Sequence, residues 1–331
     1  MNWTGKRVLV TGAGGFIGSH LVEELVRRGG RVRALVHYNA LGSIANLQFV
    51  PREIIERIEV VAGDVCDAHA VRAYAEDVSV IFHLAALIGI PYSYVAPSSY
   101  VGTNIGGTLN VLEAARSAKC ERVVITSTSE TYGTAQYTPI DEKHPAVGQS
   151  PYAATKIGAD QLALSYYRSF GLPITIVRPF NTFGPRQSER AIIPTIVGQA
   201  LFNGGAVRLG SLEPRRDLTF VSDTARGFVC LAESEEAIGR AVNLGTGRSH
   251  SVRELVEMIG RELDLKVQVS LDPQRIRPDR SEVHELCADP TLAHSLGWSA
   301  QVPLEVGLAA VRDFMRARGP EVLRSAAGYR I

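Results

Sequence analysis

Tyr152 and Lys156 are the two residues whose types and spacing best suit catalysis, and they lie in the run SPYAATK. Ser150-Pro151 is typical of a helix start, so the four-residue spacing places both side chains on one face of a helix. A lysine ammonium beside a phenol lowers the pKa of the phenol. The phenolate can then take a proton from a hydroxyl group while hydride leaves the same carbon. The same spacing occurs by chance in many surface helices, so this interpretation depends on a hydride acceptor.

A glycine-rich segment near the start of the chain predicts that acceptor. The run VLVTGAGGFIG at Val8–Gly18 has the pattern of a buried strand, a glycine turn and a helix, with Gly12, Gly15 and Gly18 spaced G-x-x-G-x-x-G. Such glycines let the backbone approach a pyrophosphate, whose charge then lies against the first amides of the helix. Tight packing of a strand on a helix could select the same glycines, but the order of strand, turn and helix favours a bound dinucleotide.

The segment after the second expected strand bears on which dinucleotide is bound. Sites of this kind often have an acid there, about 20 residues on, that binds the ribose hydroxyls. Here the strand is followed by His37, Tyr38 and Asn39, so no carboxylate opposes a 2′-phosphate and the choice between NAD and NADP stays open. Asp64, in the run AGDVCD, is placed either to accept from the adenine amino group or to cap a helix that begins at Ala68.

The elements that must position these residues follow from an alternation of short apolar runs with amphipathic segments. This pattern predicts an α/β fold, a Rossmann-type doubly wound parallel sheet with helices on both faces. The expected strands are Arg7–Thr11, Val32–Val36, Glu59–Ala62, Val80–Leu84, Arg122–Ser127 and Ile174–Arg178. The expected helices are Phe16–Arg28, Thr103–Ala118, Asp223–Glu233, Val252–Leu263 and Leu304–Arg318.

Glycine and proline pairs become frequent after Pro179, and this change in composition predicts a domain boundary. We expect residues 1–180 to form the dinucleotide-binding domain and residues 181–331 to form a smaller C-terminal substrate-binding domain. Residues 218–245 have a strand and helix pattern that is expected to return to the first sheet.

Charge and cysteine content argue against several other classes of protein. Thirty-five Lys and Arg balance 34 Asp and Glu, so no basic field indicates a nucleic acid partner. The cysteines form no C-x-x-C pair and no histidine has zinc spacing, so we expect reduced thiols and no metal site. No apolar run approaches the ~20 residues that span a bilayer. The first residues also leave no room for a signal peptide, so a cytoplasmic enzyme without membrane contact is expected.

Six motifs, in this order, resemble the extended short-chain dehydrogenases/reductases that act as nucleotide-sugar epimerases and dehydratases. They are TGAGGFIG, HLAA at His83–Ala86, TSTSETYG at Thr126–Gly133, YAATK, RPFNTFGPRQ and RRDLTFVSD, and they cover nearly the whole chain. The resemblance implies that Thr128 bonds the sugar O4 or its proton relay, that Tyr152 is the base, and that Lys156 also holds the nicotinamide ribose. It further implies a tightly held NAD in contact with Gly12, Gly15, Phe16, Ile17, Gly18, His37, Asp64, Val65, Leu84, Ala85, Ala86, Ser127, Tyr152 and Lys156.

The two residues after Thr128 bear on the reaction. In the glucose 4,6-dehydratases of this family these positions hold an Asp–Glu pair, in which Asp protonates the leaving C6 hydroxyl and Glu removes H5. This chain has Ser129 and Glu130, so the resemblance implies chemistry at C5 by Glu130, with Ser129 as a substrate contact. Either Glu130 passes the H5 proton to the departing hydroxyl or another group supplies that proton. The alternative is that Glu130 only forms a hydrogen bond to the sugar.

Longer stretches are similar to the 4,6-dehydratases of N-acetylglucosamine nucleotides in the legionaminic acid pathway. This similarity implies conversion of a nucleoside diphosphate N-acetylglucosamine-type hexose to its 4-keto-6-deoxy form. The similar stretches are IGIPYSYVAP at Ile88–Pro97, STSETYGTAQ at Ser127–Gln136, GQSPYAATKIGADQ at Gly148–Gln161 and FNTFGPRQSERAIIPTI at Phe180–Ile196.

The implied substrate carries a diphosphate, which guanidinium groups suit by charge and by fork geometry. Alignment with the family places Asn181, Arg216 and Arg277 against the diphosphate and sugar, whereas Arg215 is better explained as a surface charge.

The family also implies a homodimer that pairs through residues 103–118 and 152–170. Leu109, Leu112, Leu162 and Leu164 could contribute to that contact, with packing inside the subunit as the rival explanation.

Several other functions stay open at this point. The first is a 4-epimerase acting on a UDP-hexose or UDP-uronate, which returns hydride to C4 and leaves the mass unchanged. A 5,6-dehydratase and a decarboxylase are further possibilities, although YAATK does not match the Y-D-E-G-K motif usual in the decarboxylases. A nicotinamide-sensing regulator on the same fold is the alternative that is not an enzyme, and the pair Tyr152 and Lys156 argues against it.

Overall fold

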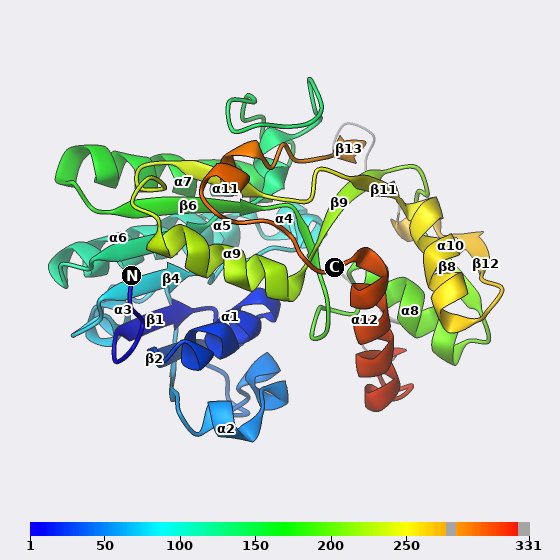
Figure 1. Ribbon diagram of the computed structural model, residues 1–331, viewed down its shortest axis with the longest axis horizontal. Coiled ribbons are helices and arrows are strands. Elements are labelled where there is room, and N and C mark those ends of the chain that lie inside the picture. Colours follow the sequence, from blue (N-terminus) through cyan, green and yellow to red (C-terminus); the bar gives the residue numbers. More distant parts are fainter. Residues whose placement is uncertain (276–282, 324–331) are drawn as a thin grey trace.

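A computed structural model of the chain describes residues 1–275 and 283–323, so Arg277 lies outside the described residues. Its main feature is a seven-stranded parallel sheet in the order β10-β6-β5-β4-β1-β2-β3 (Figure 1). The six strands expected from the first half of the sequence are all present, each within one residue of its expected ends. The strands are β1 Arg7–Thr11, β2 Arg31–His37, β3 Glu59–Gly63, β4 Val80–His83, β5 Arg122–Thr126, β6 Ile174–Pro179 and β10 Ala241–Leu244.

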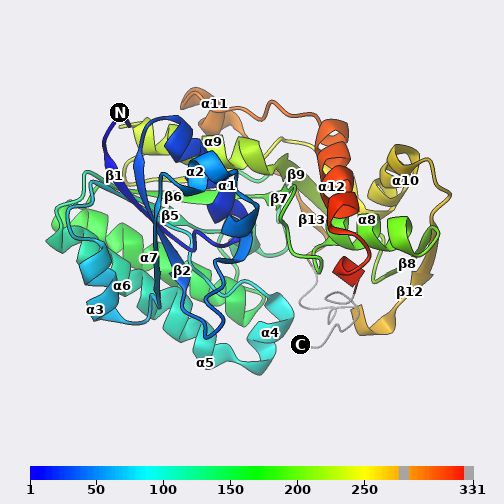
Figure 2. The same ribbon diagram turned by 90° about the horizontal axis from the view of Figure 1, so that it is seen from below.

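Helices cover both faces of this sheet, which confirms the Rossmann-type fold (Figure 2). One face packs against α1 (Phe16–Arg27) and α9 (Val221–Glu233). The other face packs against α3 (Ala68–Tyr74), α6 (Gly107–Ser117) and α7 (Pro151–Phe170). The central strands are rich in Val and Ile because their side chains are buried on both faces.

The helix expected over residues 103–118 is divided in two, which the sequence analysis did not anticipate. A π-helical turn, Val101–Gly106, precedes α6. Asn104 lies in this wide turn with its side chain buried, where it accepts from the Leu87 N–H at 2.9 Å and donates to the Leu87 carbonyl at 3.0 Å. π-helical turns often occur at functional sites, and this one fixes the chain that follows β4.

A smaller lobe with its own apolar core lies beside the C-terminal edge of the sheet, at the right of Figure 1. Its strands are β7 Asn181–Phe183, β8 Ala206–Leu209, β9 Arg215–Phe220, β11 Ser249–Ser251, β12 Gln268–Leu271 and β13 Glu285–Leu286. Its helices are α8 Ile192–Phe202, α10 Val252–Leu263 and α12 Leu304–Arg318. The amphipathic pattern of α10 and the Ser251–Glu254 capping box at its start explain why that helix begins where the sequence predicts.

The chain returns from the smaller lobe to the main sheet twice. Residues 221–244 supply α9 and β10, and β10 pairs with β6 in parallel. Helix α11 (Thr291–Ser295) then packs beside β10, and Trp298 donates to the Asp223 carbonyl at 2.9 Å. The second return was not expected from the sequence.

Short helical segments complete the described chain. They are α2 Arg52–Ile55, α4 Ile90–Val95, α5 Pro97–Tyr100 and the 3-10 turns Ala45–Phe49, Ser129–Tyr132 and Pro273–Arg275. None of the helices in the described part of the chain is both long and apolar enough to cross a membrane.

Candidate functional site

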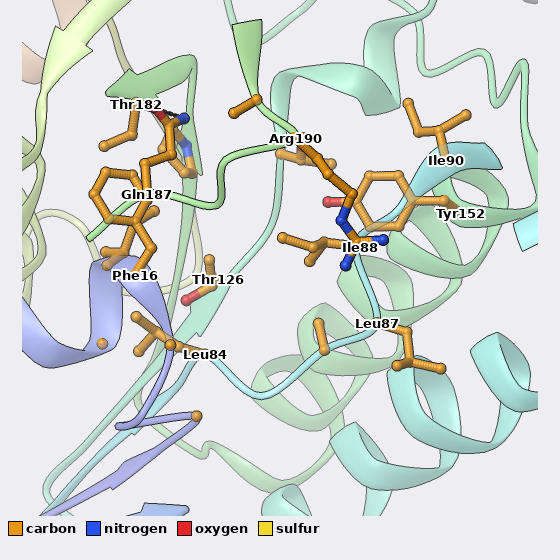
Figure 3. Close-up of a pocket in the computed structure, with 18 of the residues that line it drawn as sticks. Phe16, Leu84, Leu87, Ile88, Ile90, Thr126, Tyr152, Thr182, Gln187 and Arg190 are labelled. Carbon is orange, nitrogen blue, oxygen red and sulfur yellow. Dashed lines mark hydrogen bonds between the residues drawn. The ribbon is translucent and has the colours of Figure 1, made fainter. Parts of the chain in front are cut away.

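A cavity of about 1080 Å³ runs between the two lobes at the carboxyl ends of the main strands (Figure 3). This is where open parallel sheets bind their ligands. It brings together the residues that sequence analysis placed at the site, with two exceptions. Arg277 is outside the described residues, and Ser129 is not part of the lining. The lining residues among those predicted are Gly12, Gly15, Phe16, Ile17, Gly18, His37, Asp64, Val65, Leu84, Ala85, Ala86, Ser127, Thr128, Glu130, Tyr152, Lys156, Asn181 and Arg216.

Glycine is needed at the three motif positions for different physical reasons. A Cβ on Gly12, where φ is +69°, would lie 2.7 Å from the Ala85 nitrogen, and a Cβ on Gly18 would lie 2.2 Å from the Gly12 carbonyl oxygen. Gly12 is therefore required by the close approach of the chain that follows β4, and Gly18 is required by the packing of α1 on the turn that follows β1. Gly15 differs, because its added Cβ would meet within the protein a single atom, the Gly12 carbonyl oxygen, at 3.0 Å. Its open side faces the cavity.

The start of α1 fits a pyrophosphate. Gly15 is the N-cap of a 12-residue helix, and neither a capping side chain nor an acidic residue occupies the first turn. The first amides of α1 are therefore left to a ligand, and the positive end of the helix favours an anion there. The Gly15 N–H already donates to the Gly12 carbonyl oxygen at 2.9 Å, so the amides of Phe16 and Ile17 are the groups that would hold a dinucleotide diphosphate.

Asp64 is available to a ligand rather than to a helix. The cap of α3 is Asp67, whose side chain accepts from the His69 and Ala70 amides, so the capping interpretation of Asp64 is wrong. Asp64 lies at the end of β3 and accepts from the Cys66 N–H at 2.9 Å through one of its two oxygens. It lines the cavity, as does the exposed His37.

Tyr152 and Lys156 lie on one buried face of α7. Ser150 caps this helix by accepting from the Ala153 amide at 3.1 Å, and Pro151 occupies its first position, as the run SPYAATK predicts. Burial raises the pKa of Tyr152, a hydrogen bond with Thr128 lowers it, and the charge of Glu130 raises it. The phenol therefore needs nearby positive charge in order to act as a base at neutral pH.

Lys156 is the cation on the same helix face. Its Nζ donates to the Thr126 carbonyl oxygen at 2.6 Å. Burial lowers the pKa of Lys156, and the carboxylate of Asp160 acts in the opposite direction. Asp160 is a residue that sequence analysis missed, although its place four residues after Lys156 was a usable signal.

Thr128 and Glu130 are brought to the cavity by a 3-10 turn that follows β5. The Thr128 side chain caps this turn by accepting from the Glu130 N–H at 3.2 Å. Glu130 lines the cavity together with Thr128 and Tyr152. Ser129 is buried and is not among the residues that line the cavity, so its contact with substrate stays a prediction.

Several polar atoms of the cavity wall have no hydrogen-bond partner among the described residues. Buried oxygens of Thr126, Asn181 and Gln187 are unpaired, and all three residues line the cavity. Buried polar groups without partners are rare in folded proteins, so these oxygens mark places where a polar ligand would bind. Asn181 was predicted from the run RPFNTFGPRQ, and Thr126 and Gln187 were not.

Two cationic side chains that sequence analysis missed also line the cavity, namely Arg190 and Arg275. Arg190 follows β7 by seven residues and extends toward the same end of the cavity as Tyr152 and Ile88 (Figure 3). A charged residue directly after a predicted binding motif was the available signal. Arg216 on β9 and Arg275 line the cavity in the smaller lobe.

His83 and Asn104 support the floor of the site, and sequence analysis assigned neither a role. His83 Nδ1 lies 2.8 Å from Thr11 Oγ1 and its Nε2 lies 3.1 Å from Thr108 Oγ1. Burial and the charge of Lys156 lower the pKa of His83 to about 3, so the ring stays neutral. Asn104 donates to Thr155 Oγ1 at 3.0 Å and so joins its π-helical turn to α7.

Comparison with known proteins shows which family shares this architecture. A family model described as GDP-mannose 4,6 dehydratase matches residues 9–311. A UDP-glucose 4-epimerase of Mycolicibacterium smegmatis is 35% identical over 317 residues, which are 94% of this chain and 98% of that protein.

Solved structures agree with that result. Epimerase Mth375 of Methanothermobacter thermautotrophicus has a TM-score of 0.88 at 30% identity, covering 98% of this chain and 96% of that one. The dTDP-glucose 4,6-dehydratase DesIV of Streptomyces venezuelae, with NAD and TYD bound, has a TM-score of 0.84 at 31% identity, covering 94% and 97%. Dehydratases and epimerases are thus both among the similar proteins.

Proposed function

Because the chain belongs to the extended short-chain dehydrogenase/reductase family of nucleotide-sugar dehydratases and epimerases, we propose that it is a 4,6-dehydratase. Its substrate would be an N-acetylglucosamine-type hexose carried on a nucleoside diphosphate, and its cofactor would be NAD. The N-acetylglucosamine assignment rests on the stretches that are similar to the dehydratases of the legionaminic acid pathway. The presence of NAD in the related DesIV structure supports the choice of cofactor.

Oxidation at C4 is assigned to the buried face of α7. Tyr152 takes the proton of the C4 hydroxyl, and Thr128, which shares a hydrogen bond with that phenol, orients it. Lys156, fixed on the Thr126 carbonyl, supplies the positive charge that favours the phenolate. NAD, when bound, accepts hydride from C4 and later returns it to C6.

The observation that carries the proposal is the position of Glu130. Asp64 and Glu130 are the carboxylates that line the described part of the cavity, and Asp64 follows β3, which lies four strands from β5 in the sheet. Glu130 is therefore the carboxylate near Tyr152, close enough for its charge to act on the phenol, and we assign this end of the cavity to the sugar. A ketone at C4 makes H5 acidic, and a carboxylate at this place is suited to remove it.

The elimination can then be completed by the same side chain. Glu130 takes H5, the C6–O bond breaks, and the departing hydroxyl leaves as water with the proton that Glu130 has just received. This route is favoured because Ser129, which cannot act as a carboxylic acid, does not reach the cavity. The double bond that forms between C5 and C6 is reduced at C6 by the hydride taken from C4. C5 receives a solvent proton through Glu130, and Tyr152 releases to solvent the proton that it took from the C4 hydroxyl, which gives the 4-keto-6-deoxy sugar and restores both side chains.

A 4-epimerase is the second candidate function. It is favoured by the lack of an acid at position 129 and by the 35% identity to a UDP-glucose 4-epimerase. In that reaction Tyr152 and Lys156 would act as before, and Glu130 would bind the sugar without removing H5.

The mass of the product separates the two functions. Wild-type protein is incubated with UDP-, GDP- and dTDP-linked glucose and N-acetylglucosamine, and the nucleotide sugars are analysed by mass spectrometry. A 4,6-dehydratase removes one water, whereas an epimerase leaves the mass unchanged. NMR of a dehydrated product distinguishes the 4-keto-6-deoxy sugar from the product of a 5,6-dehydratase. An epimer of unchanged mass as the sole product would overturn the proposal.

A further inference from the structure

A buried aspartate lies directly behind the catalytic pair. Tyr152, Lys156 and Asp160 follow one another at four-residue intervals on α7, and all three are buried. Asp160 is 1% exposed. A carboxylate buried this deeply is retained as an anion only where other groups compensate its charge.

The hydrogen bonds to the Asp160 carboxylate all end on one of its two oxygens. Three donors converge on its Oδ2: Ser127 Oγ at 2.8 Å, Arg178 Nη2 at 2.9 Å and Arg178 Nε at 3.2 Å. Its Oδ1 is buried and has no hydrogen-bond partner among the described residues. The hydrogen bonds to Oδ2 therefore fix the side chain in place, and the negative charge of the carboxylate is shared by both oxygens.

The side chain of Arg178 is fixed by a further hydrogen bond, to Tyr132. Its Nη1 donates to Tyr132 Oη at 3.0 Å, and Tyr132 donates to Asn243 Oδ1 at 2.7 Å. The network thus connects α7 through β6 to β10, and the position of Asp160 is set by the sheet rather than by the cavity. Ser127, which donates to Asp160, stands next to Thr126, whose carbonyl accepts from Lys156.

We propose that Asp160 is a positioning residue of the catalytic pair, whose buried carboxylate keeps Lys156 protonated on the Thr126 carbonyl. Burial lowers the pKa of Lys156, and Asp160 opposes that effect. The same carboxylate raises the pKa of Tyr152. Removal of its negative charge therefore lowers both pKa values, because the cationic lysine loses stabilisation and the phenolate loses repulsion.

Other titratable groups lie around Tyr152, Lys156 and Asp160, and their charges also affect the protonation of these three residues. Glu130 on the 3-10 turn and Tyr100 on α5 act on Tyr152, and Arg178 on β6 acts on Asp160. His83 on β4 lies near Lys156 but stays neutral, since its pKa is lowered to about 3. Asp160→Asn keeps the shape of the side chain and leaves Glu130, Tyr100 and His83 unchanged, while Arg178 loses the negative charge of its partner.

The proposal rests on Tyr152-dependent oxidation and is tested by the pH profile of the holoenzyme. In Asp160→Asn both limbs of the profile of kcat are expected to move to lower pH by about 1 unit. Asp160→Glu keeps the charge, so its limbs should stay near those of wild type even where kcat falls. Asp223→Asn is the matched control, because Asp223 is another fully buried aspartate that is paired with an arginine, Arg226, far from Lys156. Its limbs should not move.

A second measurement, NMR of Lys156 in the wild-type protein, does not depend on whether a variant at Asp160 folds. The chain has five lysines, so ¹³C labelling at lysine Cε gives few resonances, and that of Lys156 is the one absent from Lys156→Met. In wild-type holoenzyme this resonance should report a protonated amine throughout the pH range of activity. A Lys156 that is already neutral there, or a uniform loss of activity in Asp160→Asn with unmoved limbs, would overturn the proposal. If no cofactor reduction depends on Tyr152, the proposed function is overturned instead. The NMR measurement would still report the protonation state of Lys156 in that case.

Discussion

Burial sets the chemistry of the catalytic side chains. Tyr152 is removed from water, which opposes its ionisation, and a hydrogen bond with Thr128 acts in the opposite direction. The spacing of Tyr152 and Lys156 and the helix start at Ser150 could be read from the sequence, because they are local features of α7. The partners of Asp160 could not be predicted, because Arg178 lies on a strand that only the folded sheet brings beside α7.

The role of Tyr152 leads to the first prediction at this scale. Tyr152→Phe removes the proton acceptor and keeps the ring packed against Tyr100, with which it makes an edge-on contact at 6.3 Å. The variant should bind NAD and nucleotide sugar and lose ~10²–10⁴ in kcat. Steady-state rates together with a binding titration provide the check. Turnover near that of wild type would remove Tyr152 from the mechanism.

Arg190 leads to a second prediction. Its guanidinium lines the cavity at the Tyr152 end, and the structure gives it no acidic partner among the described residues. Arg190→Met keeps the length of the side chain and removes its charge, so KM for the nucleotide sugar should rise about tenfold or more while NAD affinity is unchanged. An unchanged KM would show that Arg190 is a surface charge.

At the scale of elements, the ends of the strands could be predicted from the sequence and the π-helical turn before α6 could not. Strand ends were predictable to within one residue because buried Val and Ile runs stop where the loops begin. The π-helical turn before α6 was not predictable, since its hydrophobic pattern continues that of the helix and only the burial of Asn104 against Leu87 explains the wider turn.

Two glycines of the same loop give a matched pair of variants. Gly12→Ala places a Cβ 2.7 Å from the Ala85 nitrogen at φ +69°, and it should lower the free energy of unfolding by about 2 kcal/mol or more. Gly15→Ala has an ordinary φ of −73°, and its Cβ meets only the Gly12 carbonyl oxygen, at 3.0 Å, but it also enters the expected pyrophosphate site. It should lose less stability than Gly12→Ala and should lose NAD affinity. Thermal unfolding without added nucleotide, paired with NAD titration, checks both, and equal effects in the two variants would contradict this division.

At the scale of the whole molecule, the cavity lies between the two lobes. The chain returns from the smaller lobe to the main sheet twice, and only the first return was expected from the sequence. The glycine and proline content predicts a domain boundary after Pro179, but no local feature of the sequence predicts the return of α11 and Trp298 to the main sheet. That return depends on a contact with Asp223, far away in sequence, and no local pattern records such a contact.

Assembly belongs to the same scale. Leu112 is fully buried in the subunit core, so its expected part in a dimer contact is wrong. Leu109, which the family resemblance also indicated, is exposed on α6, and the large exposed apolar side chains of α7 are Tyr167 and Phe170. We expect two copies to pair through this face, and Leu109→Glu should then shift the protein to monomer in analytical ultracentrifugation at micromolar concentration. A wild-type protein that is already monomeric would contradict the dimer.

The central claim is that Glu130 removes H5 after oxidation at C4, and Glu130→Gln tests it most directly. The amide keeps the shape of the side chain and cannot act as a base. With the accepted N-acetylglucosamine nucleotide in deuterated water, the variant should accumulate reduced cofactor beside an unreleased 4-keto sugar, because oxidation needs Tyr152 and not Glu130. It should incorporate deuterium at C5, measured by NMR and mass spectrometry, far more slowly than wild type and form little dehydrated product. Formation of the deuterated 4-keto-6-deoxy sugar at the wild-type rate would contradict the claim and leave Glu130 as a binding residue.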